Sequence, residues 1–172
     1  MRKLLVLVPL LFVASLAAQD YPRVEAFGGY QFTHLGNGAD VNLNGWNASV
    51  TGNLNKMFGV TGDFSGSYKT ISGVSAHVYT YTGGPVVSLN RDGKINPFVH
   101  ALFGGARFGA SLSGFGSGAT NGFTVMAGGG ADAKLNDRFA IRLIQADWVY
   151  YRFSGINESK NVRISSGIVF RF

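Results

Sequence analysis

The sequence predicts an all-β fold made of eight antiparallel strands that close into an up-and-down barrel. The first observation is a strict alternation of apolar and polar residues in many segments, which is typical of strands because successive side chains point to opposite faces. The second is composition: charged residues make up 14% of the chain and glycine accounts for 25 residues, whereas soluble domains carry about 25% charged residues. The third is a regular alternation of short and long connections.

The N-terminus has the pattern of a secretory signal peptide. A basic start, Met1–Lys3, precedes an apolar stretch from Leu4 to Ala14 and the small residues of Ser15–Ala18. The apolar stretch is well short of the roughly 20 residues that a spanning helix needs. We therefore expect residues 1–17 to be removed, by cleavage after Ala17 or Ala18, and residues 18–172 to form one barrel domain.

Eight segments show the strand pattern. The first, Arg23 to Thr33, alternates apolar and small residues with polar ones, and Glu25 falls on the polar side. Pro85 weakens the fourth strand because proline cannot donate a ladder hydrogen bond. The remaining predicted strands cover 46–54, 58–68, 79–88, 97–107, 123–132, 139–152 and 161–172.

Connections between these segments alternate in length. Short turns are expected around residues 55, 92 and 136, and the Asp92-Gly93 pair is a typical hairpin signal. Longer loops are expected at 34–44, 69–76, 108–122 and 153–160. Outer-membrane barrels have this asymmetry, with brief periplasmic turns and longer external loops. An even strand number then leaves both termini on the periplasmic side.

The seventh segment breaks the alternation. Arg142 and Asp147 lie on opposite parities, so one of them would face outward on a regular strand. A β-bulge inserts one extra residue and shifts the phase of the alternation. The sequence therefore predicts a bulge between Ile144 and Ala146.

The last segment is the clearest strand of the chain. Ile168, Phe170 and Phe172 share its apolar face, while Arg163 and Arg171 lie on the other face. An uncovered apolar edge strand would be prone to aggregation in a soluble protein. In a closed membrane barrel the same strand pairs with the first one and its apolar face meets lipid.

The composition of the polar face favours a membrane barrel over a soluble barrel of the lipocalin kind. A water-exposed exterior would carry many Lys and Glu residues, whereas this face holds mainly Asn, Ser, Thr and Gly with a few charges of both signs. Such residues fit a narrow lumen, in which charges must be paired. We expect a lumen ion network made of Glu25, Asp63, Asp132, Arg142 and Arg163, acting either as a plug or as a gate.

Four short segments and the strand pattern resemble the OmpA/OmpX-like eight-stranded outer-membrane barrels. The segments are Ala26–Tyr30, Pro97–Ala101, Gly128–Asp132 and Val169–Phe172. The resemblance covers nearly all of the expected mature chain. It implies a monomer in the outer membrane of a Gram-negative bacterium, surrounded by lipids. It also implies that Ile168, Phe170 and Phe172 form the signal for the barrel-insertion machinery. The peptidoglycan-binding domain of full-length OmpA has no counterpart in this sequence.

Motifs for other chemistry are weak. Asp40–Gly45 matches the first half of a calcium loop, but Thr51 stands where a bidentate Glu is required. The glycines at 114, 116 and 118 lack the Lys-Ser/Thr of a phosphate loop, and no basic cluster suggests nucleic-acid binding. The chain has no cysteine, and we expect neither a metal nor a cofactor.

Three functions are compatible with these observations. A structural or surface-interaction role, with a ligand held by the external loops and no open pore, is favoured. A small gated porin-like channel is the second. A lipid-modifying enzyme is the third and is not expected, because His34, His77 and His100 are isolated in sequence from any recognisable nucleophile and orienting carboxylate.

Overall fold

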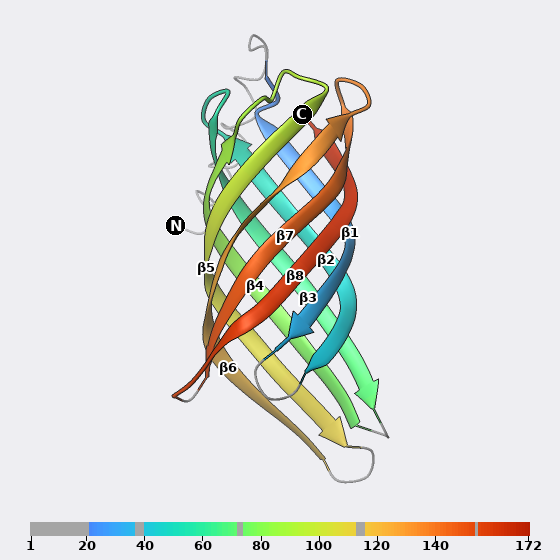
Figure 1. Ribbon diagram of the computed structural model, residues 1–172, viewed down its shortest axis with the longest axis vertical. Coiled ribbons are helices and arrows are strands. Elements are labelled where there is room, and N and C mark those ends of the chain that lie inside the picture. Colours follow the sequence, from blue (N-terminus) through green and yellow to red (C-terminus); the bar gives the residue numbers. More distant parts are fainter. Residues whose placement is uncertain (1–20, 37–39, 72–73, 113–115, 154) are drawn as a thin grey trace, which may run out of the picture.

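Eight antiparallel strands form a closed barrel in which each strand pairs with its neighbours in sequence (Figure 1). The computed structural model describes residues 21–36, 40–71, 74–112, 116–153 and 155–172. The predicted signal peptide, residues 1–17, lies outside these ranges. The predicted fold class and strand number are confirmed. The strands are β1 (Val24–Leu35), β2 (Val41–Asn53), β3 (Phe58–Ile71), β4 (Val74–Ser88), β5 (Ile95–Leu112), β6 (Gly116–Lys134), β7 (Phe139–Phe153) and β8 (Ile156–Arg171).

Pairing of β8 with β1 closes the barrel, as the sequence predicts. The register runs from Glu25 opposite Arg171 to Leu35 opposite Asn161. Beyond it, the amide of Phe172 donates to the carbonyl of Val24 at 2.9 Å. The last strand therefore has no free edge along its paired length.

Alternating side chains divide each strand between lumen and exterior. On β3, Thr61, Asp63 and Ser65 are buried in the lumen, whereas Val60 and Phe64 are each 54% exposed on the outer face. Apolar side chains that face outward in this way suit a lipid environment. Within the described ranges, no helix is long and apolar enough to cross a membrane.

A β-bulge interrupts β7, close to its predicted position. Arg142 pairs with Gly167 and Gln145 with Ser165, so two residues of β7 oppose one residue of β8. The side chains of the two bulge residues, Leu143 and Ile144, both face outward. The bulge thus begins one residue before the predicted window of 144–146.

Because of this bulge, side chains on both sides of it reach the lumen. Arg142 precedes the bulge and Asp147 follows it, and both are buried. A regular strand would send one of these two charges to the outer face.

The predicted long loops are mostly strand, which corrects the expectation for 34–44, 69–76, 108–122 and 153–160. β5 and β6 continue to pair from Phe108 opposite Thr120 to Leu112 opposite Gly116. Gly, Ser and Ala bring no bulky side chains into conflict, so an established ladder continues through them despite their low strand propensity. The β5–β6 hairpin extends further than the neighbouring strands at the end opposite the C-terminus (Figure 1).

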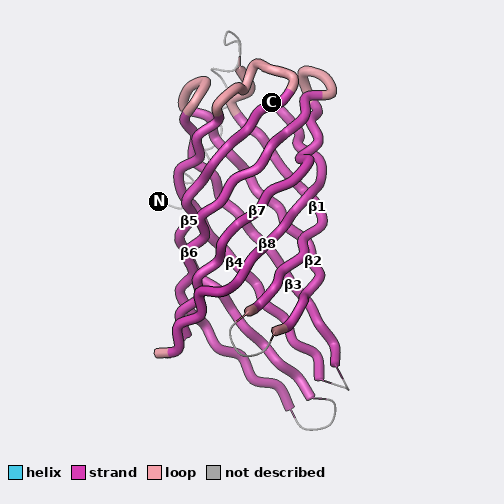
Figure 2. The backbone as a smooth tube through the Cα atoms, in the orientation of Figure 1, coloured by secondary structure: helices cyan, strands magenta, loops and turns pink. Residues whose placement is uncertain are grey.

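Short turns lie together at the end of the barrel that also holds the C-terminus (Figure 2). Two of them use the same design. The side-chain oxygen of Asn55 accepts hydrogen bonds from the amides of Met57 and Phe58, and that of Asn136 accepts from the amides of Arg138 and Phe139. Such Asx turns preorganise tight reversals. In the second turn, a hydrogen bond from Lys134 lowers the pKa of Asp137.

Deleting Leu143 should remove the bulge, so that either Arg142 or Asp147 would point toward lipid. We expect a loss of at least about 3 kcal/mol in unfolding free energy, because a buried ion pair would be broken. The measurement is urea unfolding in phospholipid vesicles. Leu143→Ala keeps the strand length and should cost about 1–2 kcal/mol through lost apolar contact. Equal effects of the two changes would show that the bulge does not set the phase.

Candidate functional site

Arg163 occupies the centre of a group of charged side chains in the lumen. It lies on β8 and is 1% exposed. Its Nη1 donates to Oδ1 of Asp63 on β3 at 2.7 Å. Its Nη2 and Nε lie 2.7 and 2.8 Å from Oδ2 of Asp147 on β7. One guanidinium thus joins opposite parts of the barrel wall.

A second guanidinium, that of Arg142, binds Asp132 on the neighbouring strand. Nε and Nη2 of Arg142 donate to the two carboxylate oxygens of Asp132 at 2.8 and 3.1 Å, the two-pronged geometry that makes such pairs strong. The guanidinium carbon lies 4.3 Å from the ring centroid of Phe27 and 4.4 Å from that of Phe98. Both distances are within the range of cation–π attraction.

Gln145 connects the two guanidinium groups. Its Oε1 accepts from Nη1 of Arg142 at 2.7 Å, and its Nε2 donates to Oδ2 of Asp147 at 2.8 Å. A continuous chain of hydrogen bonds therefore crosses the lumen. We call its members the lumen ion cluster: Asp63, Asp132, Arg142, Gln145, Asp147 and Arg163.

His100 reaches the cluster across a glycine. His100 on β5 pairs with Gly128 on β6, and Gly128 pairs with Asp147 on β7. The Nε2 atom of His100 lies 2.7 Å from Oδ1 of Asp147. A Cβ at Gly128 would come within 2.3 Å of that same Oδ1. The missing side chain at Gly128 is what lets histidine and aspartate meet.

Four of the five residues predicted for the ion network belong to this cluster. The exception is Glu25, which faces Arg171, with Oε1 and Nε 3.0 Å apart. The two lie directly opposite each other at the paired ends of β1 and β8. Glu25 therefore forms a separate pair near the C-terminus, although it lines the same small lumen cavity as Asp63 and Arg142.

Sequence reasoning left Asp147, Gln145 and His100 out of the network. The parity conflict between Arg142 and Asp147 was the available signal, because a bulge that turns both inward makes Asp147 a lumen residue. His100 shares the lumen face of its strand, but its partner lies two strands away. Nothing in the sequence spacing indicates that pairing.

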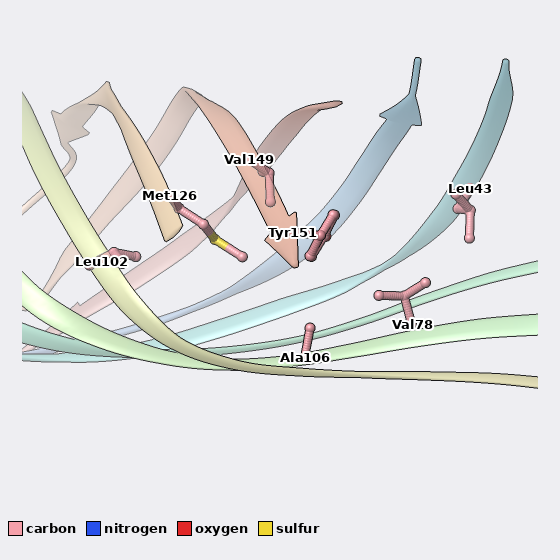
Figure 3. Packing of buried hydrophobic residues seen from close by; sticks show 7 residues of the cluster. All are labelled: Leu43, Val78, Leu102, Ala106, Met126, Val149 and Tyr151. Atoms are coloured by element: carbon pink, nitrogen blue, oxygen red, sulfur yellow. The ribbon is translucent and has the colours of Figure 1, made fainter. Parts of the chain in front are cut away.

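An apolar layer fills the lumen on the side away from the C-terminus. The sequence predicts a lumen lined by small polar and charged residues, and this layer corrects that expectation for one part of the lumen. Side chains from several strands meet there (Figure 3). Leu102, Met126 and Val149 are 0% exposed, and the full layer consists of Leu43, Val78, Leu102, Ala106, Met126, Val149 and Tyr151. The sequence predicts a loop at 34–44, whereas Leu43 lies on β2 with its side chain buried in the lumen.

Aromatic side chains encircle part of the outer face. The indole nitrogen of Trp46 donates to the hydroxyl of Tyr68 at 3.2 Å, and that hydroxyl lies 3.2 Å from the hydroxyl of Tyr79. The hydroxyl of Tyr150 donates to Asn157 at 2.9 Å. Amphipathic rings in such a band suit a membrane–water boundary.

Ile168, Phe170 and Phe172 lie on the outer face of the closing strand. They are exposed, and the ring of Phe170 contacts that of Phe139, with centroids 5.0 Å apart. This arrangement presents a row of apolar side chains next to the C-terminus.

Metal chemistry has little support. Within the described ranges, no group of three or more His, Cys, Asp or Glu residues is arranged to hold a metal ion. The calcium-like pattern at Asp40–Gly45 lies mostly on β2, where Leu43 points into the lumen while Asn42 and Asn44 are exposed. Alternate residues of an extended strand stand about 6–7 Å apart and do not wrap around one ion as a loop does, and the side-chain oxygens of Asn42 and Asn44 are hydrogen-bonded to His34 and Tyr30.

Arg163→Met should destabilise the barrel by about 3–5 kcal/mol, because two carboxylates lose their buried partner. Arg142→Ala should also lower the melting temperature in detergent. The control is Lys56→Met, which breaks an exposed pair with Asp92 and should cost less than about 1 kcal/mol. Urea unfolding in lipid vesicles measures the differences. A loss for Arg163→Met as small as that of the control would contradict the role of the cluster.

Comparison with solved structures shows the same fold in three bacterial proteins. Ail, the attachment invasion locus protein of Yersinia pestis, matches with a TM-score of 0.64 and 18% identity over 88% of this chain and 99% of Ail. Neisserial surface protein A matches with a TM-score of 0.71 and 10% identity, covering 90% and 100% of the two chains. OprG from Pseudomonas aeruginosa has a TM-score of 0.54 and 10% identity, covering 90% and 98%. Ail has also been solved with the heparin analogue sucrose octasulfate.

Sequence comparisons agree with this fold. A search of curated proteins gives no match. The profile of the outer membrane protein β-barrel domain matches residues 4–172, which is nearly the whole chain. The chain therefore belongs to the outer membrane protein β-barrel domain family, and it is an integral protein of the bacterial outer membrane.

Proposed function

We propose that this protein is a closed, non-conducting barrel with a structural and surface-interaction role. The observation that carries the proposal is the position of Arg163, whose guanidinium binds carboxylates from β3 and β7 across the lumen. Ions crossing the barrel would have to break this arrangement. The cost of separating such buried partners is several kcal/mol.

Packing supports a closed lumen. Eight strands enclose an interior just wide enough for side chains to fill. The cavity beside Asp63, Asp132 and Arg142 has a volume of about 20 Å³, which is space for about one water molecule. The apolar layer adds a second obstruction on the extracellular side.

The surface-interaction role is supported by the long hairpins. β5 and β6 contain 18 and 19 residues, whereas about 9–11 residues are enough for a strand to cross the membrane. The extra length projects beyond the bilayer. Arg107 and Arg152 are exposed on this part of the outer face, as is Lys160. A ligand at these ends is consistent with the sugar-like molecule bound to Ail.

A gated channel built on the same cluster is the second candidate. The charged residues themselves favour it, since rings of charge line many selective pores. The lipid-modifying enzyme has less support. His34 contacts Asn42 and Asp40, and His100 contacts Asp147. In the described part of the chain, neither histidine is hydrogen-bonded to a serine or threonine hydroxyl that could act as a nucleophile.

Planar-bilayer recording separates the closed barrel from the channel. The purified protein should give no discrete conductance steps, because the lumen ion cluster and the apolar layer both block the path. Lys56→Met should be equally silent. Steps in the wild type that change in Arg163→Met but not in Lys56→Met would establish the gated channel instead.

We further propose that residues 1–17 are cleaved on export and that Ile168, Phe170 and Phe172 direct insertion. The barrel is proposed to be a monomer surrounded by outer-membrane lipids. Support comes from the exposure of all three apolar side chains on the closing strand. Phe172 is 67% exposed, so its ring adds little to folded-state packing.

Phe172→Ala should reduce the amount of assembled barrel severalfold in cells while leaving unfolding in vesicles nearly unchanged. Heat-dependent migration on gels of outer-membrane fractions measures assembly. Leu135→Ala is the matched control, because Leu135 is 63% exposed in the turn between β6 and β7. Equal assembly of the two variants would argue against a terminal insertion signal.

A further inference from the structure

An apolar cavity opens at the extracellular end of the lumen. Its volume is about 480 Å³, within the range of roughly 300–1,000 Å³ that is typical of small-molecule sites. It lies between β1, β2, β4, β5 and β6. Leu35, Val41, Leu43, Val78, Phe108 and Ala110 provide most of its apolar surface.

The cavity has a closed floor. Leu43 and Val78 line it and are 1% and 5% exposed. They pack in the apolar layer with Leu102 and Met126, which are 0% exposed (Figure 3). Below this layer lies the lumen ion cluster. A molecule that enters from outside is therefore held at this level.

The cavity also has a continuous wall toward the membrane. Ala76 pairs with Ala110, and Ala110 with Gly118, in unbroken ladders of β4, β5 and β6. A two-chain lipid in the bilayer has no opening through this wall. A ligand therefore enters the cavity from the external medium. The volume of the cavity suits a molecule with a single hydrocarbon chain.

One lysine, Lys69, lies next to the residues that line the cavity. Lys69 shares the inward-facing parity of Ser65 and Ser67 on β3 and lies directly opposite Ala76, which lines the cavity. Among the described residues, Lys69 has no carboxylate within ion-pair distance. Lys69 is half-buried, and a lysine next to an apolar cavity is suited to an anionic head group attached to an apolar tail.

We propose that this cavity binds a single-chain amphiphile with a carboxylate head, namely a medium-chain fatty acid. The tail lies against Leu43, Val78 and Phe108, and the carboxylate meets Lys69. The inference rests on the proposed closed lumen, because the floor makes the cavity a binding site and not the entrance of a channel. The ligand of the proposed surface-interaction role would then be a medium-chain fatty acid.

The test uses the full barrel in lipid nanodiscs with labelled Leu and Val methyl groups, titrated with decanoate. The methyl signals of Leu43 and Val78 should shift and saturate. Val60 and Val99 face lipid and are 54% and 52% exposed, so their signals report decanoate that has only entered the bilayer. Shifts that do not saturate and are equal at all four residues would overturn the proposal.

Two glycines provide a matched pair of variants. A Cβ at Gly118 or at Gly28 would have no atom within 4 Å, so both positions accept a side chain without a clash. Gly118 lines the cavity, whereas Gly28 is exposed on the outer face of β1. Gly118→Trp should abolish the saturable shifts, and Gly28→Trp should retain them. Unchanged binding in Gly118→Trp would place the ligand elsewhere.

The head-group contact has its own test. Lys69→Met should weaken decanoate binding about tenfold, the effect of losing one charge-assisted hydrogen bond. Binding of decanol, which has no charge, should be unaffected. Equal affinity of Lys69→Met and wild type for decanoate would remove Lys69 from the site. Conductance in planar bilayers would contradict the closed lumen without affecting these binding measurements, so the two proposals fail separately.

Discussion

The structure depends on burying Arg163 in the lumen with enough negative charge around it. A guanidinium that is 1% exposed cannot lose its proton, so its charge must be matched by fixed partners. Asp147 on the adjacent strand supplies one carboxylate, and Asp63 supplies another from across the barrel. Because Arg163 lies on β8 and its partners lie on β3 and β7, the pairing constrains the relative position of strands that are not neighbours in the ladder.

The bulge in β7 and the glycine in β6 are local features that this constraint explains. Without the bulge, Arg142 and Asp147 would face opposite sides of the wall, and a charge on the lipid face costs about 2–4 kcal/mol near the membrane centre. Leaving Leu143 and Ile144 both on the outer face costs little there, since both are apolar. Gly128 likewise has no side chain, which leaves room for His100 to approach Asp147. Each local irregularity allows a charged group to be paired.

Period-two alternation predicted the fold, the strand order and the face on which most charges lie. It could not predict which charges meet, because partners across the lumen depend on the stagger of strands around the barrel. Glu25 was therefore grouped with Asp63, although it pairs with Arg171. Composition also gave wrong ends for the strands. Residues 108–122 are rich in Gly and Ser and were predicted to form a loop, yet most of them continue the β5–β6 ladder. Leu43, placed in a loop for the same reason, turned out to be part of the apolar layer.

The two layers of the lumen depend on each other. Ion pairs weaken when water and salt reach them, because the effective dielectric constant rises and mobile ions screen the charges. The apolar layer above the cluster separates it from the external medium, so external salt screens the pairing of Arg163 with Asp63 and Asp147 only weakly. In return, the lumen ion pairs connect the strands that carry Leu102, Met126 and Val149.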